Sequence, residues 1–213
     1  WILKTLTPSL QENIRYFTTH SYLTLTVKRE AEKYYKSHSL NDCFNMGIEI
    51  YYSDNFQIQE VGVLLLGYSA HRNTSALSFL KDTVSQHDSW KVQEVLAMAF
   101  DNHCKMIGYD VALPLIKEWL ISDCANVRRA VSEGLRIWTS RPYFRDNPQI
   151  AIQLLSAHRE DTSEYVRKSV GNALRDISKK YPELISAELN SWDLSSKEIE
   201  QVYKLAGRFL DLT

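Results

Sequence analysis

The sequence predicts an all-α fold in which repeated helical units stack into a solenoid. Only seven Gly and five Pro interrupt its 213 residues, and apolar residues recur at spacings of three and four rather than two, which is the helical period. One sequence pattern also occurs four times along the chain. Together these observations favour a helical repeat protein over a mixed or all-β fold.

The repeated pattern has an apolar column followed by two polar columns. The apolar column, with spacings of 34, 35 and 39 residues, holds Ile58, Val92, Val127 and Val166. The first polar column holds Gln59, Gln93, Arg128 and Arg167, and the second holds Glu60, Glu94, Arg129 and Lys168. This period resembles that of HEAT-type repeats, helix pairs that bury their apolar faces only by stacking. We expect one domain over 1–213, with amino-terminal helices over about 1–55, repeats over about 56–192 and a capping helix over about 193–213. We expect these to form a right-handed superhelix with a concave basic face.

Helices are predicted from this periodicity, with boundaries accurate to about two to four residues. They span residues 9–20, 26–38, 41–53, 56–69, 73–86, 89–104, 109–122, 125–139, 147–158, 163–179, 181–191 and 196–211. Side chains able to cap a helix precede the repeat helices at Asp54-Asn55, Asp88-Ser89, Asp123 with Asn126, and Asp161 to Ser163. Pro148 and Pro182 lie near first helical positions. Pro114 marks either a kink or the true start of its helix. Residues 139–148 form the longest late loop, either a binding loop or a packed connector.

Composition limits the class of protein and its environment. The formal charge is −1, yet residues 128–180 hold eleven basic and six acidic side chains, so this half can face phosphates, or can simply carry solvated helix surfaces. Three scattered cysteines indicate neither a disulfide framework nor a zinc site. No segment approaches the roughly 20 apolar residues of a membrane span, and no signal pattern is present at the amino end. We expect a cytoplasmic protein, and we expect a few native residues to precede Trp1.

Stacking places equivalent repeat positions in rows on the inner surface of a solenoid. Arg129 and Glu133 are four residues apart and should be neighbours, as should Trp90 and Glu94 one repeat earlier. An aromatic ring, two carboxylates and an arginine would then converge on one concave patch. A structural interpretation also fits, because Arg129 with Glu133 can be a helix-stabilising pair and Trp90 a core aromatic.

The run NVRRAVSEGLRIWTSRPYFRDNP, continuing to EYVRKSVGNALRDISKKYPELI, is similar to the carboxyl-terminal half of the DNA alkylation repair family, the HEAT-like-repeat alkylpurine glycosylases of the AlkC and AlkD type. WKVQEVLAMAFDNHC resembles the preceding repeat. The resemblance covers about Trp90 to Trp192, roughly half the chain. It implies hydrolysis of the N-glycosidic bond of cationic N3- or N7-alkylpurines in duplex DNA. A carboxylate would stabilise the oxocarbenium-like sugar and orient water, and no metal or organic cofactor would be needed.

Carried over by position, the family's Trp-x-x-x-carboxylate element falls on Trp90 and Glu94, its arginine on Arg129, and the S-E-G carboxylate of the AlkC-like branch on Glu133. Glu94 and Asn172 depart from the Asp and Trp usual in AlkD-like members. In place of the missing aromatic wall we expect Trp138 or Tyr143, and Asp176 is a candidate accessory carboxylate. Asn172 is also expected to contact DNA. The candidate phosphate contacts are basic residues of the carboxyl-terminal half, two or three of which we expect in structural pairs instead: Arg128, Arg129, Arg136, Arg141, Arg145, Arg167, Lys168 and Arg175.

The segment VKREAEKYYKSH is expected either to probe a DNA groove, as in active relatives, or to cap the array. The partner expected is alkylated double-stranded DNA, with no membrane association, and the protein is expected to be a monomer. The alternative is a catalytically inactive repeat module that binds DNA or a protein partner. The near-zero net charge, Asn172 and the unmatched amino-terminal helices favour that alternative.

Overall fold

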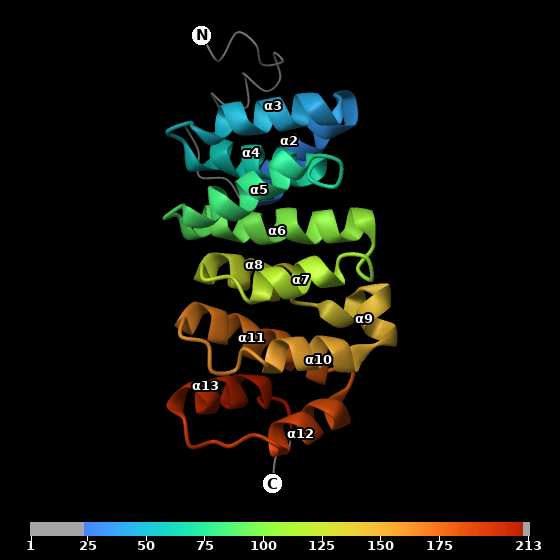
Figure 1. The fold of residues 1–213 in the computed structure, drawn as a ribbon, viewed down its shortest axis with the longest axis vertical. Helices are drawn as coiled ribbons and strands as arrows, with labels where there is room; N and C mark the ends of the chain where they lie inside the picture. Colours follow the sequence, from blue (N-terminus) through green and yellow to red (C-terminus); the bar gives the residue numbers. More distant parts are fainter. Residues whose placement is uncertain (1–23, 211–213) are drawn as a thin grey trace. The chain divides into compact units, whose positions relative to one another are not determined.

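The computed structural model describes residues 24–210 of the chain and contains only helices and connecting turns in that range (Figure 1). The chain divides into two compact units, residues 1–106 and 107–213, which are described in turn. The predicted all-α class is confirmed. The right-handed superhelix, its concave face and the single domain over 1–213 stay predictions.

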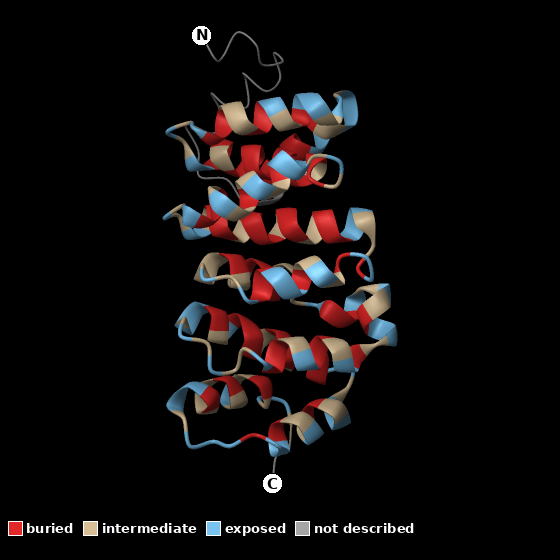
Figure 2. Ribbon diagram, viewed as in Figure 1, coloured by how far each residue is buried: buried red, intermediate tan, exposed pale blue. Residues whose placement is uncertain are grey.

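The first unit is built from five α-helices and one 3₁₀ turn in its described part. In chain order these are α2 (Thr24–Ser37), α3 (Leu40–Tyr51), α4 (Phe56–Ser69), α5 (Thr74–Asp82), η2 (Val84–Gln86) and α6 (Trp90–Ile107). The helix α4 is the centre of this unit, since α2, α3 and α5 all pack against it. Most of its residues between Gln57 and Ser69 are buried (Figure 2). This burial explains why apolar residues occur on every side of the helix and why Gln57 and Glu60 are buried polar residues.

Small residues allow the helices of the first unit to approach closely. A Cβ added to Gly67 of α4 would lie 2.7 Å from both the Cα and the Cβ of Ala99 on α6. The side chain of Asn102, one turn later on α6, donates to the carbonyl oxygen of Gly67 at 3.1 Å. The sequence therefore brings α4 and α6 together through a glycine and a short side chain rather than through large apolar groups.

The second unit contains seven further elements besides a 3₁₀ turn. They are α7 (Leu113–Leu120), α8 (Ala125–Gly134), η3 (Trp138–Ser140), α9 (Pro142–Asp146), α10 (Pro148–Ser156), α11 (Glu164–Ser178), α12 (Pro182–Asn190) and α13 (Lys197–Ala206). The helix α11 is central here, because α8, α10, α12 and α13 all contact it. Its apolar stripe, Val166, Val170, Ala173, Leu174 and Ile177, is buried against these neighbours.

Most predicted helices are confirmed, with shorter boundaries at several ends. The predicted helix over 125–139 ends at Gly134, and the one over 196–211 ends at Ala206. The predicted helix over 73–86 is divided into α5 and η2. Pro114 lies in the first turn of α7, so it marks the start of that helix and not a kink. The predicted helix over 9–20 lies outside the described residues.

The segment over 139–148 is not an irregular loop as predicted. Its residues form the end of η3 and the short helix α9, which begins at Pro142 and buries Phe144. Proline at a first helical position and a buried aromatic two residues later explain this short helix. Of the predicted capping residues, Asn55 accepts hydrogen bonds from the backbone N–H groups of Gln57 and Ile58 at the start of α4.

The amino-terminal helix α2 is packed rather than isolated. Val27, Ala31 and Tyr34 are buried on the side that contacts α4, whereas Lys28, Arg29 and Lys33 are exposed. This packing fits a capping role for the segment within its unit, while its exposed basic side chains leave groove probing as a prediction. In the described part of the chain no helix is long and apolar enough to cross a membrane.

Candidate functional site

The side chains of the first polar column form hydrogen bonds with the turn that precedes each repeat helix. Gln59 Nε2 donates to the carbonyl oxygen of Ser53 at 2.8 Å, and Gln93 Nε2 donates to that of His87 at 2.7 Å. Arg128 Nη1 donates to the carbonyl oxygen of Ser122 at 2.7 Å, and Arg167 Nη1 donates to the carbonyl oxygen of Asp161 at 2.7 Å. In all four repeats the acceptor lies six residues before the donor. Because turn carbonyls need donors when they are shielded from water, the residues of this column have a structural role in each repeat.

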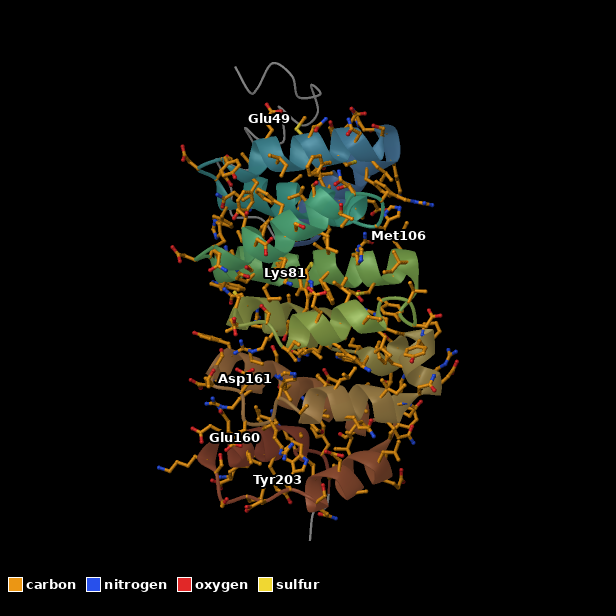
Figure 3. The ribbon with its side chains drawn as sticks, viewed as in Figure 1. Glu49, Lys81, Met106, Glu160, Asp161 and Tyr203 are labelled. Atoms are coloured by element: carbon orange, nitrogen blue, oxygen red, sulfur yellow. The ribbon has the colours of Figure 1, made fainter. Side chains whose placement is uncertain are left out.

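The change from Gln to Arg in this column adds a second contact, to the following repeat. Arg128 binds the carboxylate of Asp161, with Nε to Oδ2 at 2.6 Å and Nη2 to Oδ1 at 2.7 Å. Asp161 lies in the turn before α11 (Figure 3). Arg167 donates through Nε to Oε1 of Gln201 on α13 at 2.8 Å. Both arginines, predicted as phosphate contacts, are therefore engaged within the protein.

Burial and hydrogen bonding act in opposite directions on Asp161. Burial alone would raise the pKa of its carboxyl group, but hydrogen bonds from Arg128 and from the backbone N–H of Ser163, and the charge of Arg128, outweigh it. The net result is a pKa below the ordinary value, so Asp161 is ionised at neutral pH. Beside it, burial lowers the pKa of His158.

A second network joins α8 to α11 through the predicted site residue Glu133. Its Oε2 accepts a hydrogen bond from the hydroxyl of Ser169 at 2.6 Å, and its Oε1 lies 3.4 Å from Nη1 of Arg136. Arg136 also donates through Nε to Asp176 at 3.1 Å. The predicted catalytic carboxylate Glu133 and the predicted accessory carboxylate Asp176 are thus joined by one guanidinium across two repeats.

Asp176 is surrounded by cations. Burial would raise the pKa of its carboxyl, but hydrogen bonds from Lys179 and Arg136 and their charges bring it below the ordinary value. Arg175 Nη2 lies 3.6 Å from the same carboxylate, and its side chain is mostly buried. Several basic side chains of residues 128–180 are therefore held in internal ion pairs. Fewer positive charges are available to bind a phosphate than the count of basic and acidic residues indicates.

The remaining predicted DNA contacts lie nearer to solvent. Lys168 is exposed and pairs with Glu164 on the same helix at 2.7 Å. Arg145 is exposed and pairs with Asp146 at 3.0 Å. Arg141 lies over the ring of Tyr109 at 5.9 Å. Tyr143 and Asn172 are half-buried, on α9 and α11 respectively. Contacts of these five residues with DNA stay predictions.

Trp138 cannot form the aromatic wall predicted for it. Its side chain is fully buried, with its ring 4.6 Å from that of Phe144 in an edge-to-face arrangement. Since the sequence between Gly134 and Pro142 folds into a turn and a 3₁₀ helix rather than continuing α8, the indole is directed into the core of its unit. The prediction was wrong because it assumed one unbroken helix over 125–139.

The predicted pair Trp90 and Glu94 lies on the first turns of α6. Trp90 is the first residue of the helix and 69% of its surface is exposed, which excludes the interpretation of this residue as a core aromatic. Glu94 is half-buried one turn later. Arg129 is half-buried on α8 in the other unit. The convergence of Trp90 and Glu94 with Arg129 and Glu133 stays a prediction.

Two residues beside Trp90 were not among the predicted site residues. The ammonium of Lys91 lies 4.1 Å from the ring centroid of Phe56 and 6.0 Å from that of Trp90. Phe56 is the first residue of α4 as Trp90 is of α6, and it is also exposed. The signal was present in the sequence, because both aromatics stand two positions before the apolar column in successive repeats.

Glu60, the equivalent of Glu94 one repeat earlier, has a different environment. It is only 6% exposed. Burial raises the pKa of its carboxyl to about 7, while the positive charge of Lys91 acts in the opposite direction. Within residues 24–210 no cluster of three or more His, Cys, Asp and Glu side chains is arranged to hold a metal ion.

Comparison with known proteins places the chain in a family. Residues 12–198 match the family described as DNA alkylation repair enzyme. This chain belongs to that family. It is 51% identical to smu.31 from Streptococcus mutans UA159, over 87% of this chain and 92% of that one, with a TM-score of 0.85. It is 50% identical to AlkD2 from Streptococcus mutans, over 92% of this chain and 94% of that one, with a TM-score of 0.89.

Two more distant similarities add to this picture. The Pseudomonas fluorescens alkylpurine DNA glycosylase AlkC, solved bound to DNA containing an abasic site analog, is 20% identical over 79% of this chain and 61% of its own, with a TM-score of 0.52. That likeness concerns the HEAT-like-repeat fold. An uncharacterised Bacillus subtilis protein, YhaZ, is 37% identical over 89 residues, which are 40% of this chain but only 25% of YhaZ. The chain therefore matches about a quarter of the length of that relative.

Proposed function

We propose that this protein binds alkylated duplex DNA and releases cationic alkylpurines by hydrolysis of the N-glycosidic bond. The observation that carries the proposal is the exposed indole of Trp90 one helical turn before the carboxylate of Glu94. Membership of the DNA alkylation repair family supports the class of substrate. The fold that the chain shares with AlkC, an alkylpurine glycosylase, supports the type of reaction.

The main task of the enzyme in this reaction is to stabilise the positive charge that develops on the sugar. Alkylation at N3 or N7 places a positive charge on the purine, so the base is a good leaving group without a general acid. As the bond breaks, positive charge moves to the deoxyribose, where a nearby carboxylate stabilises it and orients the attacking water. In the proposal Glu94 supplies that carboxylate and the face of Trp90 holds the cationic base or the sugar. Arg129 binds a backbone phosphate next to the lesion.

Base release from methylated duplex DNA tests the proposal. Wild-type protein is expected to release N3-methyladenine or N7-methylguanine, and Glu94→Gln is expected to lose at least about 100-fold in single-turnover rate, as for removal of an electrostatic catalytic group. Glu160→Gln, an equivalent change at an exposed residue of the turn before α11, serves as the matched control. Absence of release by the wild-type protein contradicts the proposal.

A second function is favoured by specific contacts: a repeat module that binds damaged DNA without excising the base. Glu133 is occupied by Ser169 and Arg136, and Arg128, Arg136 and Arg167 are all held in internal contacts. Salt-dependent binding of duplex DNA with no base release at any enzyme concentration supports this module. Binding of a protein partner without affinity for DNA supports an inactive scaffold instead.

A further inference from the structure

The first turns of α4 and α6 carry two exposed aromatic residues, Phe56 and Trp90, and between them in contact range a half-buried lysine, Lys91. Lys91 reaches from α6 across to Phe56 on α4, with its ammonium 4.1 Å from the ring centroid of Phe56 and 6.0 Å from that of Trp90. A contact of this kind between an ammonium and an aromatic ring favours one position for a flexible lysine. Phe56 thus holds the ammonium beside Trp90.

Lys91 occupies an unusual position for a basic residue. The second residue of a helix lies at the positive end of the helix dipole, where an acidic residue would be stabilised, and α6 has no acidic residue in its first turn. Its positive charge acts on the buried carboxyl of Glu60, where it opposes the rise in pKa that burial causes. The geometry therefore leaves a positive charge, without a surface ion pair among the described contacts, next to an exposed indole.

We propose that Lys91 binds a DNA backbone phosphate at the Trp90 site and that Phe56 is the positioning residue that holds its ammonium there. The inference rests on the proposed function for the identity of the ligand. A phosphate held at Lys91 would fix the strand beside the indole, so that the nucleotide next to that phosphate lies against Trp90. Two residues that lie outside the predicted set would thus decide where the strand enters the site.

The salt dependence of DNA affinity tests the role of Lys91. Each phosphate neutralised on duplex DNA contributes about 0.9 to the slope of log affinity against log salt concentration. With a labelled duplex that contains a single abasic-site analogue, Lys91→Met is expected to reduce this slope by about 0.9 and the affinity at low salt by about tenfold. Lys91→Arg is expected to restore the slope. Lys105→Met, the same change near the other end of α6, is the matched control and is expected to leave the slope unchanged.

A double-mutant cycle tests the positioning role of Phe56. Phe56→Leu keeps the charge of Lys91 but removes the ring, so affinity is expected to fall about threefold with an unchanged slope. In the Lys91→Met background the same change is expected to have no effect. An equal loss in both backgrounds overturns the positioning role, because Phe56 would then contact DNA directly. Thermal unfolding of each variant identifies any loss caused by misfolding.

Base release measured on the same preparations separates this inference from the proposed function. A slope unchanged by Lys91→Met, with base release intact, overturns the inference alone. A slope reduced by Lys91→Met, together with no base release by the wild-type protein, contradicts the glycosylase and supports the inference. Equal reductions in Lys91→Met and Lys105→Met overturn it, since they indicate a general electrostatic field. Absence of DNA binding by the wild-type protein overturns both.

Discussion

The guanidinium of Arg128 and the carboxylate of Asp161 form two parallel hydrogen bonds, at 2.6 and 2.7 Å, between successive repeats of the second unit. The side chains are 11% and 4% exposed. The same guanidinium also holds the turn before its own helix through the carbonyl oxygens of Ser122 and Asp123. One side chain therefore fixes a turn and joins two repeats.

Replacement of this arginine by glutamine separates its two tasks. Arg128→Gln is expected to keep the turn contact, which Gln93 makes in the same column, but to leave the buried Asp161 without its partner. We expect a loss of about 3 kcal/mol in the free energy of unfolding, measured by urea denaturation. Arg167→Gln is the matched control, because its partner Gln201 is neutral, and is expected to lose about 1 kcal/mol. Equal losses in the two variants would contradict this division of roles.

Gly67 is expected to tolerate no side chain. Gly67→Ala places a Cβ 2.7 Å from the backbone Cα of Ala99, which cannot move without separating α4 from α6. We expect a loss of about 1–3 kcal/mol in the free energy of unfolding. Adding Ala99→Gly removes one of the two close contacts and is expected to restore only part of that loss. A neutral effect of Gly67→Ala on the urea midpoint would show that the helices are less tightly packed than the structure indicates.

Glu60 predicts an unusual dependence of stability on pH. Its pKa is about 7 in the folded protein against 4.5 for an ordinary glutamate, so between these values the folded state holds a proton that the unfolded state releases. Stability is then lost as pH rises from about 4.5 to about 7 and stays low above that. Glu60→Gln is expected to remove this loss and to stabilise the protein at pH 8 by on the order of 2 kcal/mol relative to wild type. A constant difference between the two proteins at pH 5 and pH 8 would refute the assignment.

Trp90 is expected to matter for DNA and not for folding. Because 69% of its surface is exposed, Trp90→Ala should change the free energy of unfolding by no more than about 0.5 kcal/mol. Affinity for duplex DNA with an abasic-site analogue is expected to fall by about 1–3 kcal/mol, the usual contribution of an aromatic stacking partner. Trp119→Ala, a change of the same kind at a fully buried residue, should cause a large loss in the free energy of unfolding and a small change in DNA affinity. A large loss of stability in Trp90→Ala would mean that its indole belongs to the packed structure.

Periodicity located the helices well but not every end. Spacing of apolar residues predicts a face to bury, and the start of α4 at Phe56 and of α6 at Trp90 followed from it to within one residue. The end of α8 at Gly134 did not, because the chain after it turns to direct Trp138 into the core. A turn of this kind depends on which space the neighbouring helices leave free, and no local pattern reports it.

Some features of the candidate site could be predicted from the sequence, and others could not. The exposure of Trp90 is consistent with the site role assigned to it, whereas the internal contacts of Arg128, Arg167 and Glu133 could only be found in three dimensions. An arginine in a helix has the same local sequence whether it binds a phosphate or the next repeat. What distinguishes the two is the acceptor within reach, and Asp161 lies 33 residues from Arg128 in the chain.

The all-α class, the repeat period and the family can be read from the amino-acid sequence, because they follow from residue types and their spacings along the chain. Which polar side chains of those repeats are held in internal contacts depends on the packing of the helices in three dimensions. Physically, a charged group satisfies its hydrogen bonds with the nearest suitable partner, and stacking of the repeats brings Asp161, Gln201 and Ser169 to the arginines and the glutamate that would otherwise face solvent.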